Sequence, residues 1–108
     1  WQSPTMSPHC DDDKKYGIVD KLVAHFKTAA EKGDKIAGQA VRELITVNGI
    51  RVVLADGTWG LIRASSNKPE LVVVVESPTS EANLRAIFAA LDAELRKYPE
   101  VGAYNQKI

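Results

Sequence analysis

Two turn dipeptides, Asn48-Gly49 and Asp56-Gly57, stand eight residues apart and constrain this chain more than any other sequence feature. A two-residue hairpin turn of type I′ needs positive φ at both central positions, a conformation that Asn, Asp and Gly tolerate. The residues around both dipeptides are rich in β-branched types. The pattern therefore predicts a meander of three antiparallel strands, over Val41–Val47, Ile50–Ala55 and Thr58–Ala64.

A fourth strand is predicted over Leu71–Glu76, after the polar loop Ser65–Glu70, because its first five residues are all apolar. The leading segment, residues 1–10, contains Pro4 and Pro8, which lack a backbone donor. We interpret it as a linker between domains or as an edge strand around Thr5–Ser7. The sheet is accordingly expected to have four strands, or five if the leading segment pairs.

Two segments with helical spacing flank the strands. The acidic run Asp11–Asp13 suits a helix N-terminus, and a helix is predicted from there to near Gly33. Its apolar stripe is Ile18, Val19, Leu22, Val23 and Phe26. The second helix is expected to run for about twenty residues, to begin at Ser77, Thr79 or Ser80 and to stop at Pro99. Its expected core residues are Leu84, Ile87, Phe88, Leu91, Leu95 and Tyr98.

The order of these elements predicts an α+β domain in which both helices cover one face of an antiparallel sheet. The opposite face is left for water or for a partner domain. With 108 residues, the chain is long enough for one core. We assign the domain to residues 11–98 and interpret residues 99–108 as a C-terminal tail.

Composition excludes several classes of protein. Fourteen Lys and Arg residues balance fourteen Asp and Glu residues, which disfavours general affinity for nucleic acid. The longest apolar run, Ala86–Leu91, is far too short to cross a membrane. A single cysteine, Cys10, and the lack of a leader favour the cytoplasm. Because the chain opens at Trp1 rather than at a methionine, we expect it to be a fragment of a longer protein.

The loop from Arg63 to Pro69 differs from the tight hairpins beside it. It offers a guanidinium, hydroxyl groups, an amide and an ammonium group, which together suit an oxyanion such as phosphate. Pro69 fixes its own φ and restricts Lys68, so the loop is partly preorganised. The alternative is an ordinary solvated turn, because Ser, Asn and Pro are common turn formers.

A family resemblance favours the first interpretation. The segment from Asp56 to Pro69, with its Gly-Thr-Trp-Gly strand and Arg-Ala-Ser-Ser-Asn-Lys-Pro loop, resembles the C-terminal domain of the α-D-phosphohexomutases, which include phosphomannomutases and phosphoglucomutases. The run Cys10–Lys15 resembles that domain's first residues, usually Cys-Pro-Asp-Asp-Lys-Lys. The similarity covers roughly residues 10–98, and it implies a TATA-box-binding-protein-like arrangement of sheet and helices.

The resemblance implies that the loop holds the phosphate of a phosphosugar, and that five residues bind it, namely Arg63, Ser65, Ser66, Asn67 and Lys68. The family often has Asn-Thr where this chain has Ser66-Asn67, and commonly an acidic residue or Thr at the position of Lys68. All the replacements are polar donors, so the chemistry of anion binding is retained.

In the family, the complete enzyme moves a phosphoryl group between positions 1 and 6 of a hexose, using a phosphoserine and Mg²⁺. The motifs for these groups and for sugar recognition belong to earlier domains and are absent from this sequence. The resemblance therefore implies that this chain has no catalytic or metal-binding residue and is inactive alone. Its implied partners are mannose or glucose phosphates and the remaining domains of the same enzyme.

Other candidates carry less weight. His9 and Asp11–Asp13 have metal-ligand side chains, but adjacent residues rarely converge on one ion and the acids suit a helix cap. His25 has no evident partner, Trp59 suits either sugar stacking or packing, and nothing beyond nearby lysines activates Cys10. The rival function is a stand-alone protein-interaction or nucleic-acid-binding module that uses the open face of the sheet.

Overall fold

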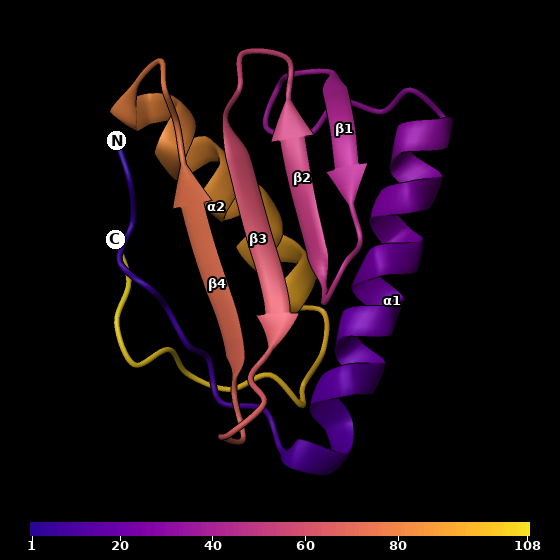
Figure 1. The fold of residues 1–108 in the computed structure, drawn as a ribbon, viewed down its shortest axis with the longest axis vertical. Coiled ribbons are helices and arrows are strands. Elements are labelled where there is room, and N and C mark those ends of the chain that lie inside the picture. Colours follow the sequence, from indigo (N-terminus) through magenta and orange to yellow (C-terminus); the bar gives the residue numbers. More distant parts are fainter.

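A computed structural model describes all residues, 1–108, as two helices and one sheet (Figure 1). The elements follow the predicted order: α1 (Asp12–Glu31), β1 (Val41–Ile45), β2 (Ile50–Leu54), β3 (Trp59–Ala64), β4 (Leu71–Glu76) and α2 (Glu81–Leu95). The α+β class is therefore confirmed. No helix combines the length and the apolar character needed to cross a bilayer.

The sheet is an antiparallel meander in the order β1-β2-β3-β4. Both predicted turns connect adjacent strands. Asn48 and Gly49 both have positive φ, 57° and 132°, as predicted, but in the second turn only Gly57 does, at 92°, so the prediction of positive φ at Asp56 was wrong. β1 ends two residues before its predicted end, β2 ends one residue early and β3 begins one residue late, whereas β4 has its predicted bounds. The pairing of β1 with β2 is interrupted by an irregularity between Val41 and Glu43.

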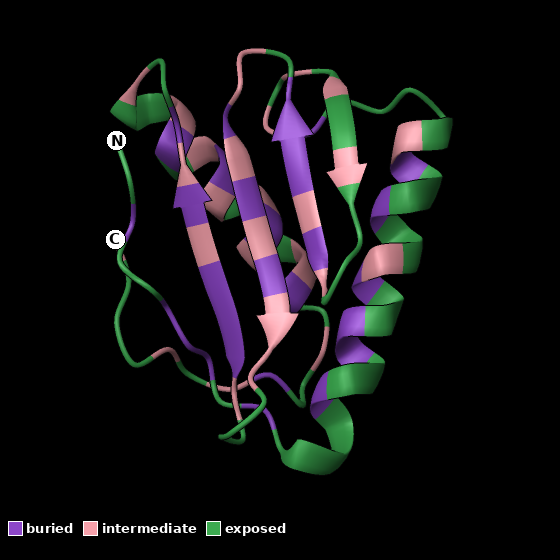
Figure 2. Ribbon diagram, in the orientation of Figure 1, coloured by how far each residue is buried: buried purple, intermediate pink, exposed green.

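Both helices pack against the face of the sheet that carries the core. In Figure 1, α2 lies behind the strands, and α1 runs along the side of the sheet next to β1. Gly60 lies at the closest approach of β3 to α2, because a Cβ there would lie 2.5 Å from Leu91 and 3.2 Å from Ile87. Figure 2 shows buried residues alternating with half-buried ones along β3. Nineteen buried apolar residues between helices and sheet form a single core, as the hydrophobic periodicity predicted.

Helix α2 is shorter than predicted, with 15 residues rather than about twenty. Its start is confirmed at Ser80, whose side chain accepts a hydrogen bond from the Asn83 amide at 3.0 Å. Pro99 disfavours helical backbone at the residue before it, so the helix stops at Leu95 and tight turns follow. The expectation that Phe88 and Tyr98 belong to the buried core was wrong, because both are only half-buried.

The leading segment lies along the free edge of β4 without forming a regular strand. Met6 exchanges two backbone hydrogen bonds with Val73, at 2.9 and 2.7 Å, and the Ser3 amide donates to Val75. Met6 is fully buried in the core. The prolines that flank this segment cannot donate, so the pairing consists of isolated bridges rather than a continuous ladder.

Candidate functional site

The loop between β3 and β4 has its own internal hydrogen bonds. The Ser65 amide donates to the Glu70 carbonyl at 3.0 Å, and the Glu70 amide donates to the Lys68 carbonyl at 2.8 Å. The Ser65 hydroxyl oxygen accepts from the amides of Asn67 and Lys68 at 3.4 and 3.3 Å. The oxygen is used by the loop, while the hydroxyl hydrogen stays available to donate to a ligand.

Arg63 stands next to this loop, near the end of β3 and opposite Val72 on β4. Its side chain takes part in none of the hydrogen bonds or ion pairs within the protein, and no carboxylate lies within 4.0 Å of its guanidinium. Arg63 is half-buried as a residue, and its guanidinium, with five donors unused within the protein, is suited to bidentate binding of a phosphate or carboxylate.

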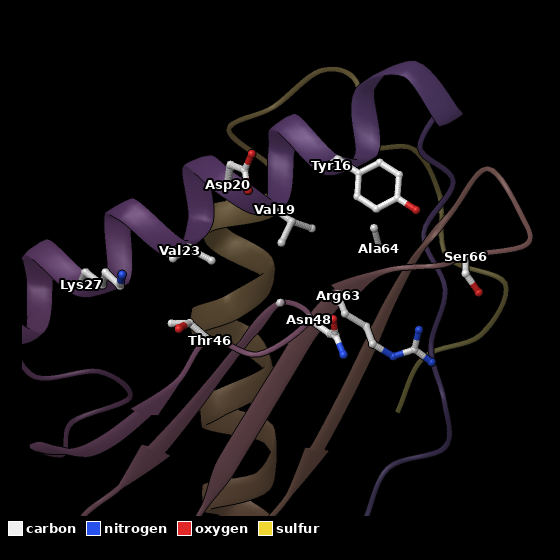
Figure 3. A pocket seen from close by; sticks show the side chains of 11 residues that line it. Tyr16, Val19, Asp20, Val23, Lys27, Thr46, Asn48, Arg63, Ala64 and Ser66 are labelled. Atoms are coloured by element: carbon white, nitrogen blue, oxygen red, sulfur yellow. The ribbon is translucent and has the colours of Figure 1, made fainter.

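A groove of about 790 Å³ opens between α1, the turn joining β1 to β2, and the end of β3. Tyr16, Arg63 and Ser66 lie toward one end of the groove, and Lys27 and Thr46 toward the other (Figure 3). Gly49 forms part of the floor and approaches Arg63 so closely that a Cβ at position 49 would lie 2.8 Å from the Arg63 Cβ. The turn therefore fixes the base of the Arg63 side chain.

The five predicted residues are not all equivalent in the structure. Arg63 and Ser66 line the groove, and Ser65 supports the loop through its hydroxyl oxygen. Asn67 and Lys68 lie outside the groove lining and are exposed at the tip of the loop. The Ser66 hydroxyl is 3.3 Å from the Asn67 side-chain oxygen, to which it donates.

Sequence reasoning missed the second wall of the groove, which comes from the polar face of α1. Tyr16, Asp20 and Lys27 contribute to it. Helical spacing indicates that such residues are turned away from the core, but it does not say which loop they will face. Only the packing of α1 beside β2 and β3 brings them near Arg63.

Cys10 is fully buried, and that burial, followed by the nearby carboxylate of Asp11, raises the pKa of its thiol. A raised pKa disfavours the reactive thiolate. His9 pairs with Asp11 at 2.9 Å on the surface. No group of three or more His, Cys, Asp or Glu side chains comes together in a way that could hold a metal ion.

The expectation that His25 lacks a carboxylate partner was wrong. Its Nε2 lies 3.2 Å from a carboxylate oxygen of Glu94, so the pair joins α1 to α2. Trp59 is half-buried and lies outside the groove, where its indole N–H donates to Glu76 at 3.0 Å and Arg51 stacks 4.4 Å from its ring centre. Both side chains make structural contacts in the folded chain.

Comparison with known proteins identifies the domain. The family model described as the phosphoglucomutase/phosphomannomutase C-terminal domain matches residues 10–94. The chain belongs to this family. The match includes all of α1, the whole sheet and α2 up to Glu94, so it covers every helix and strand of the fold except the last residue of α2.

Three relatives illustrate the range of the family. The chain is 35% identical to a phosphopentomutase of Thermococcus kodakarensis over 72 aligned residues, and the aligned segment covers 67% of this chain. It is 34% identical over 95 residues to a phosphomannomutase/phosphoglucomutase of Pseudomonas syringae pv. tomato, covering 88% of this chain. It is 32% identical over 72 residues, 67% of this chain, to a probable phosphoglucosamine mutase of Methanothermobacter thermautotrophicus. The aligned parts represent only 14%, 18% and 14% of these relatives.

Proposed function

We propose that this chain is the domain of a phosphohexomutase that binds the phosphate group of the substrate. The observation that carries the proposal is the Arg63 guanidinium, which has no partner within the protein and stands beside a polar loop and a groove. An arginine side chain without a partner in the protein is free to bind an anion, and the phosphate of a phosphosugar is the anion that a mutase substrate offers.

In the proposed complex, Arg63 donates two charged hydrogen bonds to the phosphate. The Ser65 hydroxyl donates a third, because its oxygen already accepts from two loop amides and its hydrogen is available. The Ser66 backbone amide and the Asn67 side-chain NH₂ group supply further donors, and the exposed ammonium of Lys68 attracts the anion to the loop tip. All five residues thus have a role, with Arg63 as the principal charge partner.

The reaction proposed for the complete enzyme is transfer of a phosphoryl group between positions 1 and 6 of mannose or glucose phosphate. The proposal assigns the phosphoserine, Mg²⁺ and the transfer step to parts of the enzyme outside residues 1–108, so this chain is expected to be catalytically silent alone. Its contribution is orientation: holding the phosphate that does not react lets remote binding energy align the phosphate that does.

An NMR titration of the chain with glucose 1-phosphate tests the proposal. We expect shifts at residues 63–68, and we expect Arg63→Ala to weaken binding by about 1–3 kcal/mol, the range for charged hydrogen bonds. Arg42→Ala is the matched control, because Arg42 is exposed on β1. The same loss is expected in kcat/KM of the intact enzyme.

A second titration, with a single-stranded oligonucleotide at two salt concentrations, tests the rival function of a nucleic-acid-binding module. Salt-dependent shifts across the open face of the sheet, together with no response to glucose 1-phosphate, would replace the proposed function with the rival one.

A further inference from the structure

Two adjacent lysines in the first turn of α1 have opposite environments. Lys14 is exposed, whereas the side chain of Lys15 is only 4% exposed. Burial of an ammonium group is costly unless it is paired and hydrogen-bonded. The Lys15 ammonium has two partners: the Asp12 carboxylate at 2.8 Å and the backbone carbonyl of Lys68 at 3.1 Å.

The second partner belongs to the phosphate-binding loop. The Lys68 carbonyl also accepts from the Glu70 amide, and the Lys68 amide donates to the Ser65 hydroxyl. Both backbone groups of Lys68 are therefore held, one by Ser65 and the other by Lys15 and Glu70. Lys15 is the only residue outside the loop whose side chain bonds to residues 65–70.

Backbone contacts strengthen the same arm of the loop. The Cys10 amide donates to the Pro69 carbonyl at 2.9 Å, and the Leu71 amide donates to the Pro8 carbonyl at 3.0 Å. Residues 8–15 thus hold the loop at positions 68 and 69 and the first residue of β4, Leu71, and Lys15 makes the contact closest to the loop tip. A loop held in this way loses less conformational entropy when a ligand binds.

We propose that Lys15 is a positioning residue of the phosphate-binding loop. It fixes the backbone at Lys68, and through Lys68 the Ser65 hydroxyl, before a phosphate monoester arrives. The inference rests on the proposed function of the loop and deepens it. Lys15 contacts no substrate in this arrangement, so its effect on binding passes through the loop backbone.

The test compares Lys15→Met, Lys15→Arg and the matched control Lys14→Met, with glucose 1-phosphate as the probe in an NMR titration of the chain. Lys15→Met keeps the buried methylene groups but removes the donor, and we expect it to weaken binding about fivefold, the effect of one hydrogen bond. Lys15→Arg restores a donor and should recover most of the affinity. Lys14→Met should bind like the unmodified chain.

Signals recorded without ligand separate positioning from general stability. Lys15→Met should shift the amide signals of Lys68 and Glu70 while leaving those of β2 unchanged. If Lys15→Met binds the probe as tightly as the unmodified chain does, or if Lys14→Met weakens binding equally, the inference is wrong and the proposed function stands. If the unmodified chain does not bind the probe, the proposed function fails, and with it this role for Lys15.

A measurement on the unmodified chain covers the case in which Lys15→Met does not fold. A buried, bonded ammonium exchanges its hydrogens slowly, so the Lys15 side chain should give a side-chain ¹H–¹⁵N signal under conditions where Lys14 gives none. This signal should shift when glucose 1-phosphate is added. Equally fast exchange for both lysines, or a Lys15 signal that does not respond to bound ligand, would overturn the inference.

Discussion

The loops at the two ends of β3 carry similar polar side chains and use them in opposite ways. At the first end, the Asp56 carboxylate accepts three hydrogen bonds: from the Thr79 hydroxyl at 2.6 Å, from the Asn83 side-chain NH₂ group at 2.9 Å and from the Thr58 backbone amide at 2.9 Å. At the second end, Arg63 bonds to nothing in the protein, and the Asn67 side chain receives only the Ser66 hydroxyl.

This contrast separates a structural connection from a binding site. The Asp56 cluster joins the turn after β2 to the start of α2, and its hydrogen-bonding capacity is satisfied within the fold. The loop after β3 keeps its capacity for an external partner. Polar composition alone does not distinguish the two, because what matters is how many donors and acceptors are already used.

The largest expected loss of stability comes from substituting one of the two turn glycines, Gly49, because its surroundings are more crowded than those of Gly57. Gly49 has a φ of +132°, and a Cβ added there would lie 2.8 Å from the Arg63 Cβ and 3.0 Å from the Arg63 Cα. We expect Gly49→Ala to reduce the free energy of unfolding by about 3 kcal/mol in urea denaturation.

Gly57→Ala provides the matched comparison at the other end of β3. Its φ is +92°, but an added Cβ would meet only the Pro78 ring, at 3.2 Å. We expect a loss of about 1 kcal/mol, the cost of the left-handed backbone alone. Equal losses for the two variants would mean that the turn at Gly49 does not constrain Arg63.

The next effect tests whether the two polar loops differ in their contribution to stability. Asp56→Ala removes three accepted hydrogen bonds and should reduce the free energy of unfolding by about 2 kcal/mol, allowing for partial exposure. Asn67→Ala should change it by less than about 0.5 kcal/mol, because that side chain is exposed. A loss at Asn67 as large as that at Asp56 would contradict the contrast.

The smallest expected effect is a pH dependence of the free energy of unfolding that comes from Asp56, in the turn before β3, and not from the loop after β3. The Thr79 hydroxyl, followed by other hydrogen bonds, holds the pKa of Asp56 well below its ordinary value. A carboxyl group with a lowered pKa in the folded state stabilises the fold above its unfolded pKa of about 3.9, and this contribution falls as the pH drops toward the folded pKa.

The stability difference between the unmodified chain and Asp56→Asn should therefore shrink when urea denaturation is repeated at pH 3 instead of pH 6. Asn does not titrate, so the variant isolates the contribution of this carboxylate. A difference that stays constant between the two pH values would show that the lowered pKa of Asp56 does not stabilise the fold.

Local signals predicted most of the fold. The turn dipeptides at 48–49 and 56–57, the cap at Ser80 and the apolar run of β4 each act through neighbouring residues, so their effects are visible in a short stretch of sequence. The end of α2 was predicted less well, because hydrophobic spacing continued to Tyr98 beyond the point at which Pro99 ends the helix.

The candidate site was only partly predictable for the opposite reason. The residues of the loop could be named from the sequence, but the partners that shape it are distant in the chain. Lys15 bonds to a carbonyl fifty-three residues away, and Tyr16 reaches the groove only because α1 packs beside β3. In the sequence, a lysine within a charged run is expected to be solvated.

The two margins of the sheet are protected by different means. Along β4, the proline-containing segment occupies positions where another strand could add, and on β1 an irregular pairing coincides with the charged side chains Arg42 and Glu43. Neither margin gives a second molecule a regular template for backbone pairing. Growth of the sheet by addition of further copies of the chain is therefore disfavoured.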